Sequence, residues 1–245
     1  MTIYAVNGKE PIAAWIPSLD TAGNGTTTLT DLVGSNDGTL TGMDAATDWV
    51  ADTGAGGVRA LDFDGIDDYV SCGDPATTKL NGDVSVSAWV YPRSLNRLAI
   101  IGHAASANAF WLLLFSFGSN QKFSFWNSAS GPAVTAPNTS PLNQWSHFVA
   151  VRSSSGVEIY IDGASVATAA GASGNGSAGT ELTIGRFGSF NSYKSSSKID
   201  DIRIFNTALD ATDIAYLYNS GNGRGIVASG VVPSRRRRYA GGYGL

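Results

Sequence analysis

The 245-residue chain has one cysteine, two histidines, three glutamates and five lysines, and it has no long hydrophobic run. The lone cysteine, Cys72, excludes an internal disulfide. The longest apolar stretch, Phe110–Phe117, is far shorter than the roughly 20 residues that span a bilayer, so we expect no membrane partner. The N-terminal residues lack a basic region and an apolar core, and we therefore expect no signal peptide.

Strong helix formers are scarce, whereas turn formers, including thirty glycines, are spread along the chain. This composition predicts many short strands and an all-β fold. With 43% hydrophobic residues, the chain can build a sizeable core, and all-β chains of this length often form one domain. We expect an N-terminal arm over residues 1–10, one domain over 11–220 and a tail over 221–245.

The charge is distributed unevenly. Residues 1–223 hold eleven Lys and Arg against twenty Asp and Glu, a net charge of −9, whereas residues 224–245 hold five Arg and no acid. An acidic body is a poor binder of phosphates, so nucleic acid is not an expected partner. Arginine favours carboxylate or phosphate groups, and the tail is predicted to bind neighbouring protein subunits of a larger assembly. The predicted contact residues are Arg235, Arg236, Arg237, Arg238 and Tyr239.

Apolar and polar residues alternate with a period of two in several segments, as in half-buried strands. The clearest are Leu61–Cys72, Val84–Tyr91, Trp145–Arg152 and Val157–Ala167, the last with an Asp-Gly turn at residues 162–163. Further strands are expected at Ala13–Ile16, Leu98–His103, Phe110–Phe117, Lys122–Trp126, Glu181–Arg186 and Ile199–Phe205. Residues 18–38 and 187–197 are expected to be loops. One short helix is predicted over Ala211–Tyr218, capped by Asp210 and ended by Gly221.

Acidic residues gather at a few positions. Four acids lie within Asp62–Asp68, at the corner of the expected Leu61–Cys72 hairpin, which is either a solvated acidic corner or a metal-linked one. The spacing excludes an EF-hand, because the twelfth residue from Asp62 is Gly73. In the loop over 18–38, Asp31 and Asn36 supply oxygen atoms that either bond their own backbone or hold calcium.

Asp200 is the best single candidate for a metal ligand. Regular alternation places it on the same face as Ile202 and Ile204. If that face is the core, the carboxylate must be paired or bound to a metal, because burying a lone charge is costly.

Catalytic patterns are missing. A glycosidase needs two carboxyl groups roughly 5 to 10 Å apart, whereas Glu10, Glu158 and Glu181 are isolated from one another in sequence. No nucleophile motif accompanies His103 or His147. We therefore expect no enzymatic activity. Aromatic rings offer flat contact area, so candidate ligand-binding residues are Trp49, Trp126, Phe190 and Tyr193, with ordinary packing as the alternative for each.

Eight segments, in this order, resemble the laminin-G-like group of the concanavalin A-like jelly rolls over about residues 11–219. They are AW, GSNDGTL, ALDFDGIDDYV, VSVSAWVYP, QWSHFVAVR, VEIYIDGASVA, LTIGR and IDDIRIFNTALDATDIAYLY. The resemblance implies a sandwich of two antiparallel sheets, with calcium at its rim held by Asp200 and by the loop that carries Asp31 and Asn36. That loop is one residue shorter here than in the family. The hydrolytic relatives place a Glu pair on one strand, and this sequence has no such strand.

Members of such families mostly bind glycans or proteins, and fold alone does not choose among these functions. The favoured interpretation is a non-enzymatic adhesion or structural module on a virion surface, such as a phage capsid decoration or fibre protein. The basic tail would anchor it, and its rim would meet host glycans. The alternative is a free, extracellular lectin-like carbohydrate-binding module, and the third is a relative of the glycoside hydrolases.

Overall fold

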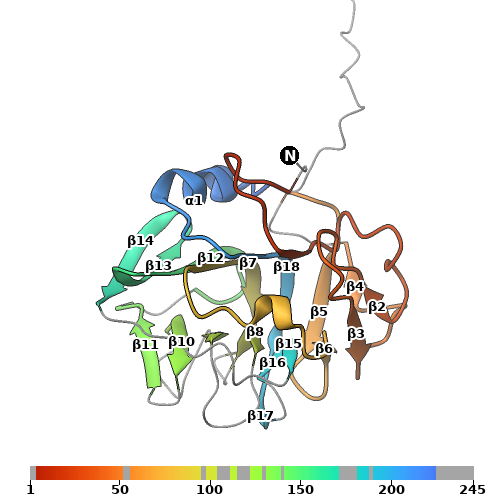
Figure 1. The fold of residues 1–245 in the computed structure, drawn as a ribbon. Coiled ribbons are helices and arrows are strands. Elements are labelled where there is room, and N and C mark those ends of the chain that lie inside the picture. Colours follow the sequence, from red (N-terminus) through yellow and green to blue (C-terminus); the bar gives the residue numbers. More distant parts are fainter. Residues whose placement is uncertain are drawn as a thin grey trace, which may run out of the picture.

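Two antiparallel sheets stack face to face (Figure 1). The computed structural model describes residues 4–51, 56–94, 98–103, 111–114, 122–128, 131–138, 141–170, 181–187 and 190–224, with only the backbone of 111–114, 127–128, 131–133 and 190–192. Sheet 1 has the order β14 (Ala164–Ala169), β13 (Gly156–Ile161), β12 (Ser146–Ser153), β7 (Val84–Pro92), β18 (Ser196–Phe205), β5 (Ala60–Asp64) and β4 (Trp49–Val50), with β1 (Ala13–Trp15) beside β18.

Sheet 2 has the order β11 (Gly131–Thr135), β10 (Ser124–Ser128), β9 (Trp111–Leu114), β8 (Ala99–His103), β15 (Leu182–Ile184), β6 (Tyr69–Ser71), β3 (Gly38–Thr41) and β2 (Thr28–Leu29). A separate two-stranded hairpin, β16 (Arg186–Phe187) and β17 (Phe190–Lys194), connects β15 of sheet 2 to β18 of sheet 1. The expected all-β sandwich with one short helix is confirmed.

The core lies between the sheets and follows the predicted alternation. On β7, Val84, Val86, Ala88 and Val90 all point into it and are fully buried. The neighbouring strands contribute Phe63, Phe148, Ala150, Val157 and Ile159 from sheet 1, and Leu40, Val70, Ile101, Phe125, Leu182 and Ile184 from sheet 2. Branched and aromatic side chains suit such pleated, buried surfaces.

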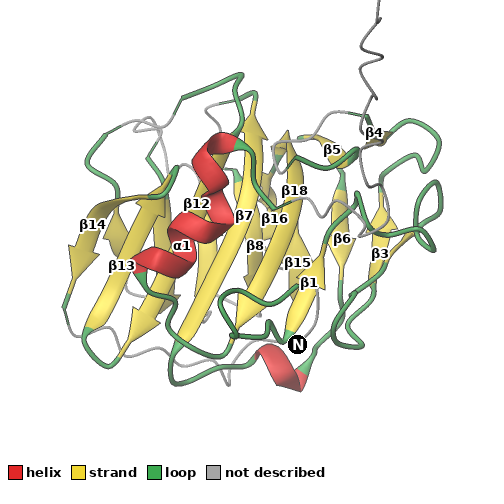
Figure 2. Cartoon of the chain, turned by 90° about the horizontal axis from the view of Figure 1, so that it is seen from above, coloured by secondary structure: helices red, strands yellow, loops and turns green. Residues whose placement is uncertain are grey.

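Helix α1 (Ala211–Tyr218) lies across the outer face of sheet 1 (Figure 2). Asp210 caps it, and Asp213 completes a capping box by accepting the backbone N–H of Asp210. The helix buries a second apolar cluster against β12, β13 and β18, formed by Val6, Val149, Val151, Tyr160, Phe205, Leu209, Ile214 and Leu217. None of the helices in the described part of the chain has the length and apolar character that crossing a bilayer demands.

The N-terminal segment is tied to the same helix. Val6 is fully buried in the α1 cluster, Asn7 donates a hydrogen bond to Asp213 over 3.0 Å, and Lys9 forms an ion pair with Asp213. Residues 4–9 therefore pack against the outer side of sheet 1.

Three local predictions need correction. The predicted helix bounds are confirmed, but the left-handed residue that ends the helix is Asn219, with φ of 48°, and not Gly221. Residues 187–197 are not a loop, because β17 and the start of β18 lie there. The loop expected over 18–38 contains the short strand β2, which pairs with β3.

Candidate functional site

Three aromatic side chains gather on the outer face of sheet 2, and we call them the aromatic patch: Trp126, Phe187 and Tyr193. Phe125 on β10 points into the core, so Trp126, the next residue, points outward. Trp126, Phe187 and Tyr193 are half-buried and pack around Ala99 of β8. Phe187 and Tyr193 meet edge to face, with ring centroids 5.8 Å apart. The strands that carry the patch, β10, β16 and β17, lie on the side of the sandwich opposite α1 (Figure 1).

The β16–β17 hairpin brings two of these rings to the patch, and Gly185 directs its course. Gly185 has φ of +79°, and a Cβ there would lie 2.5 Å from the ring of Phe63. Its N–H donates to the carbonyl of Ile100 over 3.0 Å, and its carbonyl accepts the N–H of Ser195 over 2.8 Å. Only glycine fits at position 185, because the positive φ disfavours any residue with a side chain and the ring of Phe63 leaves no room for a Cβ.

A charged cluster borders the patch toward β6. Arg186 donates to Glu181 over 3.0 Å, and its guanidinium carbon lies 3.5 Å from the ring centroid of Tyr69. Ser71 donates to the other carboxylate oxygen of Glu181 over 2.8 Å. The face thus combines aromatic rings with a paired, hydrogen-bonded carboxylate.

The structure brings together two of the four predicted ligand-binding aromatics, Trp126 and Tyr193. Phe190 lies in β17, opposite Phe187, and its side chain falls outside the described residues. Trp49 lies elsewhere, on β4 at the edge of sheet 1, where it packs against the core and donates to the carbonyl of Thr26 over 3.1 Å. Sequence reasoning named Phe190 and Tyr193 of the same expected loop but missed Phe187, because only the pairing of β16 with β17 determines which rings of this segment pack on Ala99.

Asp31 organises its own loop. Its carboxylate accepts five hydrogen bonds, from the backbone N–H groups of Ala14, Val33, Gly34 and Asn36 and from the side-chain amide of Asn36, over 2.7 to 3.2 Å. A carboxylate offers about four lone-pair sites, so these donors saturate it. Asp31 and Asn36 as arranged here therefore do not fit a calcium site.

Asp200 does not share a face with Ile202. In the pairing with β7, Asp200 lies opposite Trp89 and Arg203 lies opposite Ser87, so β18 holds one extra residue. Asp201 is that bulged residue, with φ of 45°. Ile199, Ile202 and Ile204 consequently all face the core, whereas Asp200 is buried on the outer side of sheet 1, where its Oδ1 accepts the N–H of Asp201 over 2.7 Å.

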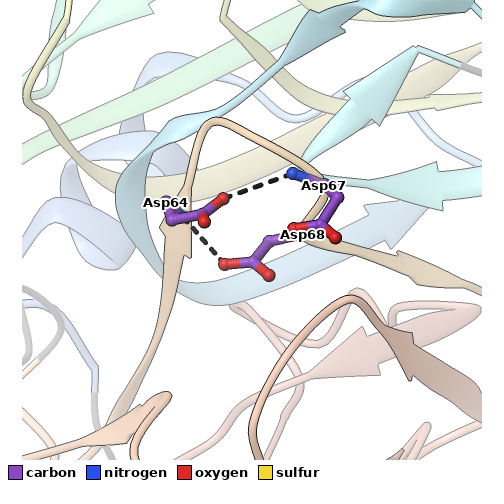
Figure 3. A group of neighbouring side chains, drawn as sticks. All are labelled: Asp64, Asp67 and Asp68. Carbon is purple, nitrogen blue, oxygen red and sulfur yellow. Dashed lines mark hydrogen bonds between the residues drawn. The ribbon is translucent and has the colours of Figure 1, made fainter.

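The predicted acidic corner is the turn between β5 and β6, where oxygens of Asp64, Asp67 and Asp68 lie within 4.8 Å of one another (Figure 3). Asp64 accepts the N–H of Ile66 over 2.6 Å, and Asp68 accepts the N–H of Asp64 over 2.8 Å. Burial and the neighbouring negative charges raise the pKa of Asp68 to about 6, although the hydrogen bond from the N–H of Asp64 has the opposite effect. These carboxylates stabilise the turn by capping its backbone. Calcium binding to the protein stays a prediction.

The two histidines are enclosed. His147 lies 2.8 Å from the hydroxyl of Ser87, but both are buried beneath α1, and burial lowers the pKa of His147 to about 3. His103 lies 3.1 Å from Asp74 and 3.4 Å from the fully buried hydroxyl of Thr78. Neither arrangement presents a nucleophile to a substrate.

A pocket of about 330 Å³ with a mixed polar and aliphatic lining lies at the end of the β12–β13 hairpin. Hydroxyls of Ser153, Ser155 and Thr168 line it together with Glu158, and no aromatic ring does so among the described residues. It therefore lacks the flat apolar contact area that the aromatic patch offers. The predicted partner-binding residues of the tail, Arg235 to Tyr239, lie outside the described residues.

Comparisons with known proteins agree with this architecture. A family model described as the concanavalin A-like lectin/glucanases superfamily matches residues 63–215. Domain 4 of AbnA, an extracellular arabinanase from Geobacillus stearothermophilus solved with arabinotriose, is 18% identical, with a TM-score of 0.63 over 87% of this chain and 98% of that one. The Trypanosoma rangeli sialidase in complex with sialic acid is 13% identical, with a TM-score of 0.61 over 84% of this chain and 32% of that one, so the chain spans about a third of the sialidase. A search of curated proteins gives no match.

Proposed function

Because the chain belongs to the concanavalin A-like lectin/glucanase superfamily, we propose that it is a non-enzymatic carbohydrate-binding module whose binding surface is the aromatic patch. The observation that carries the proposal is the gathering of Trp126, Phe187 and Tyr193 on the face of sheet 2 that no helix covers in the described part of the chain.

The chemistry of the patch suits a sugar. A sugar ring presents C–H groups on its faces and hydroxyls at its edge, so it stacks on an aromatic ring while its rim forms hydrogen bonds. Half-buried rings are already fixed by their neighbours and lose little side-chain entropy on binding. The arabinotriose bound to the similar arabinanase domain supports carbohydrate as the ligand class.

The arrangement of the acids supports binding without hydrolysis. Glu158 lies on the outer face of sheet 1, and Glu181 lies at sheet 2 in an ion pair with Arg186. The nearby acids Asp64, Asp67 and Asp68 form hydrogen bonds within their own turn. A glycosidase would need an acid and a base facing one substrate, and the described residues offer no such pair beside the aromatic patch.

The described chain ends support the proposed anchoring in a larger assembly, such as a virion. Arg203 donates to the carbonyl of Tyr4 over 3.1 Å and lies 3.5 Å from the carbonyl of Arg224. Residue 224, the last described residue and part of the predicted tail over 221–245, is thus on the α1 side of the sandwich, opposite the aromatic patch. A module held from that side would present the patch outward.

The test is affinity electrophoresis in gels containing soluble arabinan, xylan or β-glucan. We expect the wild type to be retarded by at least one of these polysaccharides. Trp126→Ala and Tyr193→Ala should each weaken binding about tenfold or more, equivalent to about 1.4 kcal/mol. Tyr216→Ala is the matched control, because Tyr216 is an exposed aromatic on α1, on the opposite side. Unretarded wild type, or equal losses in all three variants, would contradict the proposal.

A further inference from the structure

We infer that the aromatic patch selects neutral saccharides and rejects sugars that carry a carboxylate. This inference rests on the proposed function and concerns the charge of the ligand. It follows from how the cationic side chains beside the patch are already engaged.

Arg186 is the cation whose strand also carries a patch residue, Phe187. Its side chain is 10% exposed, and its guanidinium is bonded to Glu181 and stacked on Tyr69. Recognition of a carboxylate by arginine normally uses two parallel N–H donors of an accessible guanidinium. Here one guanidinium N–H donates to the carboxylate of Glu181 and the arginine side chain is buried, so a carboxylated sugar would have to displace Glu181 to reach Arg186.

Lys194 is the second cation and lies opposite Arg186 in the β16–β17 hairpin. Its ammonium group donates to the carbonyl of Ile66, within the acidic turn. Ile66 lies in the turn that carries Asp64, Asp67 and Asp68, so the Lys194 ammonium is bound to a segment with three carboxylates. This cation is therefore also held by a hydrogen bond within the protein.

The remaining charge near the patch is negative. Among the described residues, the acids Glu181, Asp64, Asp67 and Asp68 outnumber the cations Arg186, Lys194 and Lys122, which precedes β10, and residues 1–223 have a net charge of −9. An approaching carboxylate would be repelled by this field, most strongly at low ionic strength. The hydroxyls of a neutral sugar, in contrast, can donate to Glu181, whose side chain is 26% exposed.

The test compares retardation of the full chain by neutral arabinan, xylan and β-glucan with retardation by polygalacturonate, at low and at physiological salt. We expect the wild type to be retarded by a neutral polymer and not by polygalacturonate. Glu181→Gln keeps the shape and an oxygen acceptor but removes the charge. The ratio of its retardation by polygalacturonate to its retardation by the neutral polymer should rise at least threefold over the wild-type ratio. Thermal unfolding checks that each variant is folded.

Glu158→Gln is the matched control, because it makes the same charge change on the outer face of sheet 1, and it should leave both interactions unchanged. Wild-type binding to polygalacturonate as strong as to the neutral polymers would overturn the inference and leave the proposed function standing. The absence of any gain in Glu181→Gln, or an equal gain in Glu158→Gln, would overturn the role given to Glu181. Failure to bind any polymer would instead refute the proposed function.

Discussion

The buried ion pair between Asp201 and Arg203 makes the most demanding prediction about stability. Arg203 is 1% exposed and Asp201 is 3% exposed, and the two side chains meet in a bidentate pair over 2.6 and 2.9 Å. Arg203 also donates to the carbonyl of Tyr4. Removing either partner leaves a charge in a site that water does not reach, which typically costs 3–5 kcal/mol.

We therefore expect Arg203→Met to lower the free energy of unfolding by about 3–5 kcal/mol. For a chain of this size that corresponds to a fall in melting temperature of roughly 6–20 °C. Asp201→Asn should cost a similar amount, since asparagine tolerates the left-handed backbone at this position but leaves Arg203 unpaired. The double variant should lose about 1–3 kcal/mol less than the sum of the two single losses, because it leaves no lone charge.

The measurement is urea unfolding followed by tryptophan fluorescence, with melting temperatures from calorimetry. The control is Arg93→Met. Arg93 pairs with Asp62 on side chains that are 30% and 25% exposed, so its loss should cost about 1 kcal/mol or less. A cost for Arg203→Met no larger than that of Arg93→Met, or an additive double variant, would refute the reasoning.

Three further predictions concern single positions. Gly185→Ala should destabilise the fold by about 1–3 kcal/mol in urea unfolding, because its Cβ would meet Phe63 at a positive φ, and an unchanged midpoint would count against this role. The folded pKa of Asp68 is raised from 3.8 to about 6, so the folding cost of its charge is absent below pH 4 and grows as pH rises through 6. Asp68→Asn should then be about 1–3 kcal/mol more stable than wild type at pH 7.5, with the difference closing by pH 4, and no pH dependence would contradict it. Asp31→Ala should lower the melting temperature equally in calcium and in EDTA, because its partners are N–H groups, and a larger effect in calcium would point to a metal ligand.

The sequence predicted those strands and that helix in which the spacing of apolar residues matches the side chains that are buried. The inward face of β7 follows from the alternation of valine and alanine with polar or aromatic residues, and α1 follows from Asp210 and the apolar spacing after it. Strands of two residues, such as β2 and β4, could not be predicted, since their pairing partners define them and their own side chains do not.

The site was harder to predict than the fold for a related reason. Trp126 and Tyr193 were recognisable as aromatic candidates, but their meeting depends on Gly185, where the chain leaves sheet 2 and folds the β16–β17 hairpin back over it. A glycine that turns a chain outward looks like any other loop glycine in sequence. Trp49 is equally aromatic, but it packs at the edge of sheet 1, because its strand β4 pairs with β5.

The bulge at Asp201 shows what alternation alone cannot resolve. A single extra residue in β18 exchanges the inward and outward faces of the residues before the bulge relative to those after it. Regular alternation therefore misplaced Asp200, which precedes the bulge, but correctly placed Ile202 and Ile204, which follow it, on one face. The bulge has an energetic consequence: it lets three isoleucines reach the core while Asp201 and Arg203 pair on the outer side. The ion pair of Asp201 and Arg203 is therefore part of the geometry of this strand, since an apolar residue at 201 would remove the carboxylate that neutralises Arg203.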